Sequence, residues 1–219
     1  MATKVTIELT VEDALSGTSS DIEELRDEME SWRDNLEEHF SSTEKYERVS
    51  DAASALEDLD VENRTSALVE ALELASDGKA ARPACAPHIV GAPCERCGWN
   101  GHGKATELRA EEAEPAIPEF AGILKATVQF SKVKKRRASR ADRATEAASA
   151  LMAAVEVVMG RCLKAQETLE ARLLADTSAP TVPADQAALR RVAEINELAD
   201  EVDSICSELA DVDFPGMYG

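Results

Sequence analysis

The sequence predicts a mainly α-helical protein: a helical bundle with an antiparallel coiled-coil hairpin, a short amino-terminal strand and an inserted irregular zinc loop. Apolar residues recur every three or four positions through most of the chain, which is the spacing of helices that bury one face. Aromatic residues make up only 4% of the sequence, and the apolar content is mostly Ala, Leu and Val. Ala and Leu favour helix, and the small Ala side chain lets helices approach closely.

Changes in this pattern divide the chain into segments. We expect an acidic strand and helices over 1–77, an irregular Cys/His loop over 78–118, a basic connector over 119–145, a helical hairpin over 146–210 and an apolar tail over 211–219. Gly and Pro punctuate the second segment, where the helical period is lost.

The first element is a short strand, because Val5, Ile7 and Leu9 alternate with polar residues. A second alternation, Val128 and Phe130, could pair with it, since one strand is not stable alone. The fold that we predict nevertheless contains only the amino-terminal strand.

Three helices follow the strand. The first carries an apolar stripe, and Ser20 with Glu23 forms a capping box at its expected start. Trp32 belongs to this stripe and is interpreted as a core residue. A second helix is expected to begin with a similar capping pair, Ser41 and Glu44. A third covers about residues 63–75. The stripe consists of Ile22, Leu25, Met29, Trp32 and Leu36.

The hairpin is predicted by two apolar seams of heptad type, separated by a linker with two prolines. Ser139 could cap its first helix. Cys162 and Cys206 lie in the seams and are interpreted as packing residues rather than nucleophiles. Several seam positions are Ala, which suits a further helix or a second chain, so we expect a homo-oligomer. The seams are Ala148, Leu151, Val155, Val158, Cys162, Ala165 and Leu169, and Ala188, Val192, Ile195, Ala199, Val202, Cys206 and Leu209.

A metal site is predicted in the irregular loop, where the stretch CERCGWNGHGK covers residues 94–104. The spacing of Cys94, Cys97 and His102 resembles the first three ligands of the CCHC zinc knuckle, and thiolate with imidazole is a ligand set that Zn²⁺ prefers. The fourth ligand of a knuckle would fall at Glu107, so this resemblance is incomplete.

The fourth zinc ligand must come from elsewhere, and Cys85 or His88 is available upstream. We favour Cys85, because thiolate is the softer ligand. The loop is expected to serve as a structural staple more than as a nucleic-acid contact, although Trp99 could stack on bases.

A cluster of Lys and Arg residues between Lys125 and Arg143 interrupts a chain whose formal net charge is −19. One interpretation is that its cations bind phosphates; the other is that they pair with the acidic outer faces of the first three helices. The acid runs themselves are interpreted as solvated helix faces. The proposed nucleic-acid residues are Trp99, Lys132, Lys134, Lys135, Arg136, Arg137 and Arg140.

Four segments resemble an uncharacterised group of bacteriophage coiled-coil proteins: ELRDEMESWRDNLEE, TEKYERVSDAASALEDL, KKRRASRADRATEAASAL and FPGMYG. The resemblance implies a viral protein that acts in the bacterial cytoplasm or in the virion. No catalytic constellation is visible, and no signal peptide or membrane-spanning run. We therefore expect a non-enzymatic interaction protein with a viral, host or self partner, which could also contact nucleic acid. The alternative is a coiled-coil scaffold or adaptor without nucleic-acid contact.

Overall fold

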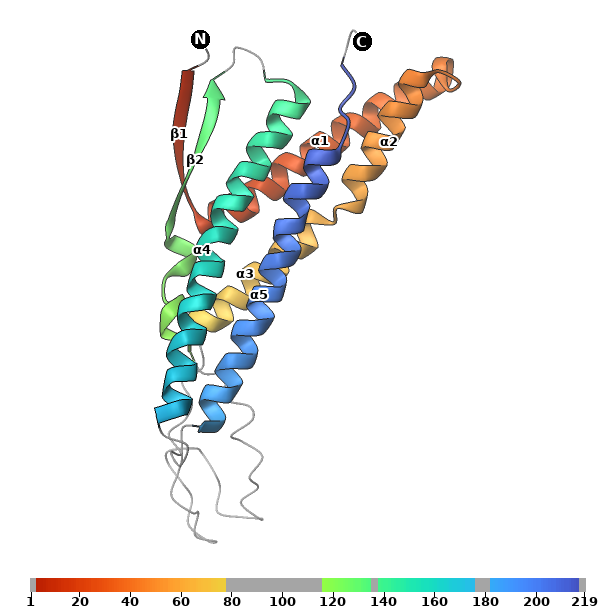
Figure 1. The fold of residues 1–219 in the computed structure, drawn as a ribbon. Helices are drawn as coiled ribbons and strands as arrows, with labels where there is room; N and C mark the ends of the chain where they lie inside the picture. Colours follow the sequence, from red (N-terminus) through yellow and green to blue (C-terminus); the bar gives the residue numbers. More distant parts are fainter. Residues whose placement is uncertain (1–2, 78–115, 135–137, 176–181, 217–219) are drawn as a thin grey trace, which may run out of the picture. The chain divides into compact units, whose positions relative to one another are not determined.

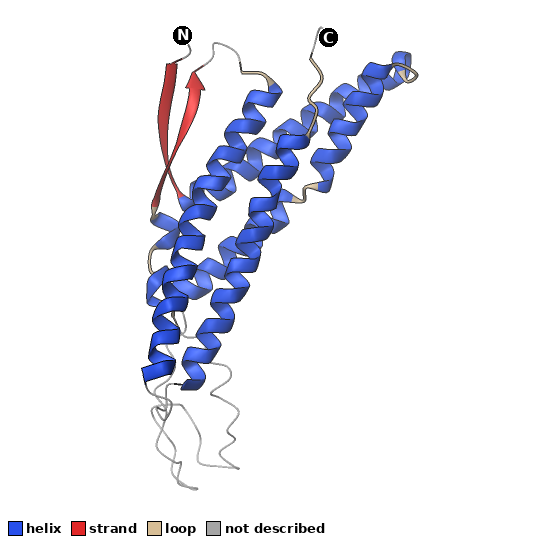
Figure 2. Ribbon diagram, viewed as in Figure 1, coloured by secondary structure: helices blue, strands red, loops and turns tan. Residues whose placement is uncertain are grey.

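The computed structural model describes residues 3–77, 116–134, 138–175 and 182–216 (Figure 1). The chain divides into two compact units. Unit 1 comprises residues 1–70, 124–159 and 196–219, and unit 2 comprises residues 71–123 and 160–195. The described residues form α-helices and one two-stranded antiparallel sheet (Figure 2), which confirms the mainly helical prediction. Within these ranges, no helix has both the length and the apolar character needed to cross a membrane.

The sheet of unit 1 consists of β1 (Thr3–Thr10) and β2 (Thr127–Lys134). The strands are antiparallel, with Ile7 opposite Phe130. The prediction of a single strand is therefore wrong. The partner strand comes from a distant part of the chain, and the backbone N–H of Val11 donates to the carbonyl of Ala126 at 3.0 Å, which closes the ribbon where β1 ends.

Helix α1 (Val11–Phe40) follows β1 directly. The hydroxyl of Thr10 accepts a hydrogen bond from the backbone N–H of Asp13 at 3.0 Å and caps the helix. The predicted start at Ser20 is wrong, because Ser20 lies inside the helix and its hydroxyl donates to the Ser16 carbonyl at 3.3 Å. The early turns are helical because Val11 and other small apolar residues bury one face.

Helices α2 (Glu44–Asp58) and α3 (Val61–Asp77) continue the chain. Thr43, rather than the predicted Ser41, caps α2 by accepting from the Tyr46 N–H at 3.3 Å. Figure 1 shows α2 returning alongside α1. The buried residues of α2 are Val49, Ala52, Ala53 and Leu56.

The guanidinium of Arg64 holds the first turns of α3 to the α2–α3 junction and to the last part of α5 (Val182–Asp211), all within unit 1. It donates to the Leu59 carbonyl at 3.2 Å, and to the Glu201 carbonyl and the Ser204 hydroxyl. It also pairs with Glu208 at 3.4 Å. Because three segments share one largely buried cation, Arg64 fixes their relative register.

The second long helix, α4 (Arg140–Ala175), is capped by Ser139 as predicted. The Ser139 hydroxyl accepts from the Asp142 N–H at 3.1 Å, and the Asp142 carboxylate accepts from the Ser139 N–H at 3.0 Å. Every predicted seam position of α4 and α5 is buried except Ala148, which is half-buried. The seam alanines are thus covered by the chain itself, and the expected homo-oligomer stays a prediction that needs another surface.

The contacts between α4 and α5 inside each unit are those expected of an antiparallel pair, because early residues of α4 contact late residues of α5. In unit 1, the Cys206 thiol donates to the Ala148 carbonyl at 3.5 Å, and in unit 2 Arg172 pairs with Asp185 at 3.9 Å. Burial, and then the nearby Asp203 charge, raise the pKa of Cys206 to about 11. A buried thiol with a raised pKa is a poor nucleophile, which fits the packing role predicted for this residue.

Unit 2 also contains residues 116–123, which include the short helical turn η1 (Pro118–Phe120) and the first residue of η2 (Ile123–Lys125). The Ile117 N–H donates to the Ala75 carbonyl at 2.9 Å, and Arg161 donates to the Glu119 carbonyl at 3.0 Å. Phe120 is completely buried. These contacts join the end of α3 and the middle of α4 through one short segment.

Asp60, between α2 and α3, has φ 45°, a left-handed conformation that β-branched residues adopt at a large cost. Its carboxylate accepts a hydrogen bond from the Asn63 amide at 2.6 Å. We expect Asp60→Val to lower the free energy of unfolding by about 1–2 kcal/mol more than Asp60→Gly does. Urea denaturation of both variants measures the difference, and equal losses would contradict a backbone origin.

Candidate functional site

The predicted metal site cannot be placed. Zinc binding stays a prediction, and the described residues add no support to it. Within the described ranges, no group of three or more His, Cys, Asp or Glu side chains could hold a metal ion. The residues that lie outside these ranges are Cys85, Cys94, Cys97 and His102, and the alternative ligand His88.

The predicted nucleic-acid residues are placed only in part. Trp99, Lys135, Arg136 and Arg137 also lie outside the described residues, and Lys134 ends β2. Lys132 and Arg140 are described, and both face acidic side chains of unit 1. The side-chain contacts of the predicted nucleic-acid residues are therefore described only for Lys132 and Arg140.

Lys132 of β2 forms an ion pair with Glu146 of α4. Its side chain is 42% exposed and that of Glu146 is 26% exposed, so solvent only partly screens the pair. The contact ties the sheet to α4 within unit 1. A phosphate would have to compete with this carboxylate for the Lys132 ammonium.

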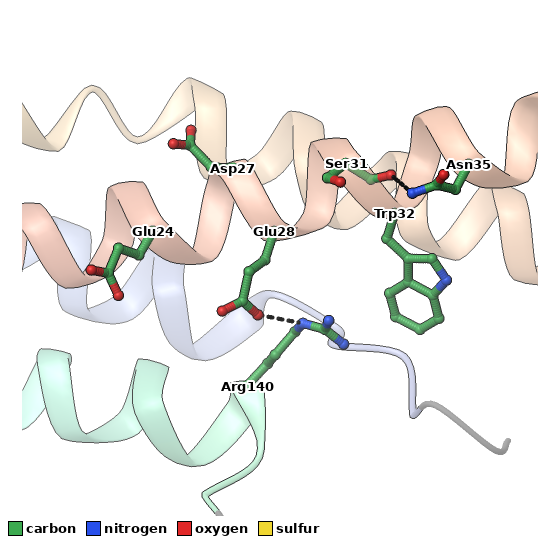
Figure 3. Close-up of a pocket in the computed structure, with 7 residues that line it drawn as sticks. All are labelled: Glu24, Asp27, Glu28, Ser31, Trp32, Asn35 and Arg140. Atoms are coloured by element: carbon green, nitrogen blue, oxygen red, sulfur yellow. Dashed lines mark hydrogen bonds and ion pairs between the residues drawn. The ribbon is translucent and has the colours of Figure 1, made fainter.

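Arg140 and Arg143, in the first turn of α4, both bind Glu28 of α1. Figure 3 shows the contact of Arg140. The nitrogen-to-oxygen distances are 3.1 Å for Arg140 and 2.8 Å for Arg143. For these cations, the structure agrees with the interpretation that the basic cluster meets the acidic faces of the first helices. Lys132 differs, because its carboxylate partner is on α4.

Trp32 of α1 is half-buried rather than part of the core, so its core assignment is wrong. The guanidinium carbon of Arg140 lies 4.8 Å from the centre of its ring, and the ammonium of Lys45 lies 5.3 Å from it. A cation near the face of an indole is attracted by the electron-rich ring. Trp32 thus contributes to recognition of cations as well as to packing.

Trp32 stands in an open groove of about 590 Å³, which we call the Trp32 groove. Figure 3 shows Glu24, Glu28 and Trp32 along α1, with Arg140 reaching toward Glu28. Among the described residues, Glu24 forms no ion pair, and Asp27 forms an ion pair only with the adjacent Arg26, at 3.4 Å. The groove is lined by Glu24, Asp27, Glu28, Ser31, Trp32, Asn35 and Arg140.

Asp21 lies one turn before the groove, and its pKa reports on the surroundings of this part of α1. The pKa of Asp21 is raised by partial burial, and then by the charges of Glu24 and Glu146, while Arg143 and Lys132 act in the opposite direction. The two nearby cations do not offset the effects of burial and of the neighbouring carboxylates on the pKa of Asp21.

The sequence contained a signal for this groove. Glu24, Glu28 and Trp32 are four residues apart and must share one helix face. The acid run was interpreted as a solvated face. Glu24 and Glu28 are indeed exposed, but the interpretation did not include Trp32 on the same face. The approach of Arg140, 112 residues after Glu28, had no local signal.

Comparison with protein-family models, curated proteins and solved structures finds no match for this chain. The resemblance to bacteriophage coiled-coil proteins therefore stays a prediction. The function has to be argued from the chemistry of the groove itself.

Asp21 offers a pH-dependent test of these electrostatics. A carboxylate whose folded pKa is raised destabilises the fold once it ionises, and this penalty is absent below its unfolded value, near 3.8. We expect Asp21→Asn to raise the free energy of unfolding at pH 7 slightly, by less than about 0.5 kcal/mol. The gain should shrink as the pH falls toward 4.

Urea denaturation at several pH values provides the measurement. Asp51→Asn, on the exposed face of α2, removes the same charge away from the cluster and serves as the control. A gain for Asp21→Asn that does not depend on pH, or that matches the control, would contradict the assignment.

Proposed function

We propose that this chain is a non-enzymatic helical adaptor that binds a basic segment of a partner protein in the Trp32 groove. The observation that carries the proposal is that one open groove is lined both by Glu24, a carboxylate with no ion pair among the described residues, and by the half-buried indole of Trp32. Carboxylates with an adjacent aromatic face are suited to Lys and Arg side chains.

Arg140 supplies an example of this chemistry within the chain. Its guanidinium lies between the Glu28 carboxylate and the Trp32 ring, at 3.1 Å and 4.8 Å respectively. Cations of a partner would use the same two kinds of contact: the carboxylates of Glu24 and Asp27, and the ring of Trp32 in competition with Arg140. Arginine is favoured over lysine, because its planar guanidinium stacks on aromatic rings and binds carboxylates through two hydrogen bonds.

The charge of the whole chain supports the same class of partner. A formal net charge of −19 attracts basic proteins over long range and repels polyanions. Two cations of the proposed nucleic-acid set, Lys132 and Arg140, form ion pairs with Glu146 and Glu28. If the bacteriophage resemblance holds, the partner is a viral or host protein in the infected cell or the virion.

Binding of a fluorescein-labelled nona-arginine peptide, followed by fluorescence anisotropy, tests the proposal. We expect an affinity in the micromolar range that weakens with salt. Trp32→Leu should weaken binding about five- to tenfold, because the cation–aromatic contact is lost. Glu24→Gln should weaken it about two- to fivefold, which is typical of one exposed charge pair.

The matched control is Glu194→Gln, which removes one exposed carboxylate from α5 in unit 2. Equal effects of Glu24→Gln and Glu194→Gln would mean that bulk charge alone attracts the peptide. Unchanged binding by folded Trp32→Leu would remove the groove from the proposal. Thermal melts of each variant establish that it is folded.

Nucleic-acid contact is the second candidate function. The observation that favours it is charge density: Lys134, Lys135, Arg136 and Arg137 are consecutive between the end of β2 and the start of α4. Together with Trp99 and the proposed zinc loop, they would supply phosphate contacts and a stacking surface.

Retention on single- or double-stranded DNA at low salt tests this second candidate. We expect retention at about 50 mM salt that falls steeply as salt rises, because each phosphate contact releases counterions. Replacing Lys134, Lys135, Arg136 and Arg137 by Glu should abolish it. No retention of the original chain at about 50 mM salt would exclude this function.

A further inference from the structure

β1 is an edge strand with one partner. β2 pairs along its whole length on one side, and among the described residues no strand pairs with its other side. Figure 1 shows β1 on the outer side of the ribbon in unit 1. An unpaired edge presents N–H and C=O groups that another strand can bind, and a two-stranded ribbon alone is only marginally stable.

The sequence of β1 is self-complementary about Thr6. In an antiparallel pair of two β1 strands centred on this residue, Lys4 of one copy lies opposite Glu8 of the other, and the reverse pair forms by symmetry. Val5 then lies opposite Ile7. Opposite charges and apolar residues placed directly across a strand pair stabilise it, whereas a parallel in-register pair would place like charges together.

Both faces of the ribbon would continue across such a pair. On one face, the amide of Gln129 already donates to the Glu8 carboxylate at 2.7 Å, and Lys4 of the second copy would approach that carboxylate from the other side. On the opposite face, Phe130 lies across from Ile7, and Val5 of the second copy would extend this apolar row. Val5 is 38% exposed in the single chain, so it has apolar surface left to bury.

We propose that β1 pairs with β1 of a second copy of this chain, which forms a four-stranded antiparallel sheet with strand order β2–β1–β1–β2. The occupant of the edge is a second copy, because the charges of β1 complement β1 itself. β2 carries no acidic residue and offers no matching pattern. The pairing uses β1 alone and is independent of the Trp32 groove.

The size of this interface sets the expected affinity. One strand of eight residues buries less surface than a stable dimer usually needs, so the self-association should be weak, with a dissociation constant of about 10–100 μM. Sedimentation velocity of the full chain between about 5 and 500 μM should show a concentration-dependent shift from monomer to dimer. A chain that remains monomeric throughout this range would overturn the proposal.

Charge reversal identifies the interface. Lys4→Glu and Glu8→Lys each convert two attractive pairs into two repulsive ones, so each should weaken dimerisation at least about tenfold. The double variant Lys4→Glu with Glu8→Lys restores both pairs and should restore the dimer. An equal mixture of the two single variants should form a mixed dimer, since each then faces its opposite charge.

Glu70→Lys, on an exposed position of α3 in unit 1, changes the net charge as Glu8→Lys does and should leave dimerisation unchanged. Failure of the mixture and of the double variant to recover dimers would place any self-association outside β1. A loss of dimers in Glu70→Lys equal to that in Glu8→Lys would mean that net charge, rather than strand pairing, controls association.

Discussion

Close approach of helices over small side chains is the constraint on which the rest of the described structure depends. Between the larger seam residues, α4 and α5 bury Ala rather than aromatic residues, which leaves little volume between neighbouring backbones. Added methylenes at such positions would force backbones apart, typically at a cost of about 1–3 kcal/mol. The buried alanines of these helices are Ala144, Ala147, Ala150, Ala154, Ala165, Ala188 and Ala199.

Trp32 and Arg64 lie outside the seams of α4 and α5. Trp32 is half-buried at the surface of unit 1, and cations approach its ring. Arg64 enters the packed region only because backbone carbonyls and Ser204 receive its donors. A burial of charge without such acceptors would be costly. Several of the described cations thus form ion pairs within the chain. Many of the more numerous acidic side chains are exposed.

Features of the fold that depend on residues close together in the sequence could be predicted, whereas contacts between distant segments could not. The seams of α4 and α5 were visible, because heptad spacing is a property of each helix alone. The start of α1 was missed, since Gly17 and the polar residues around it resemble a loop, although Val11 and Leu15 bury that part of the helix. The alternation of Val128 and Phe130 indicated a possible second strand, but no local pattern specifies that this strand pairs with β1 or that Arg140 meets Glu28.

Arg140 also sets what the Trp32 groove can select. As part of the same chain, it is present at the groove at a high effective concentration, on the order of millimolar or more for short connections. A single cation from a partner competes poorly against it for Glu28 and for the ring of Trp32. A segment with several cations would compete better for that ring, because Glu24 and Asp27 would bind its other cations along α1. If the groove binds a partner as proposed, the internal arginine would bias it against isolated cations and toward basic runs whose spacing follows the turns of α1.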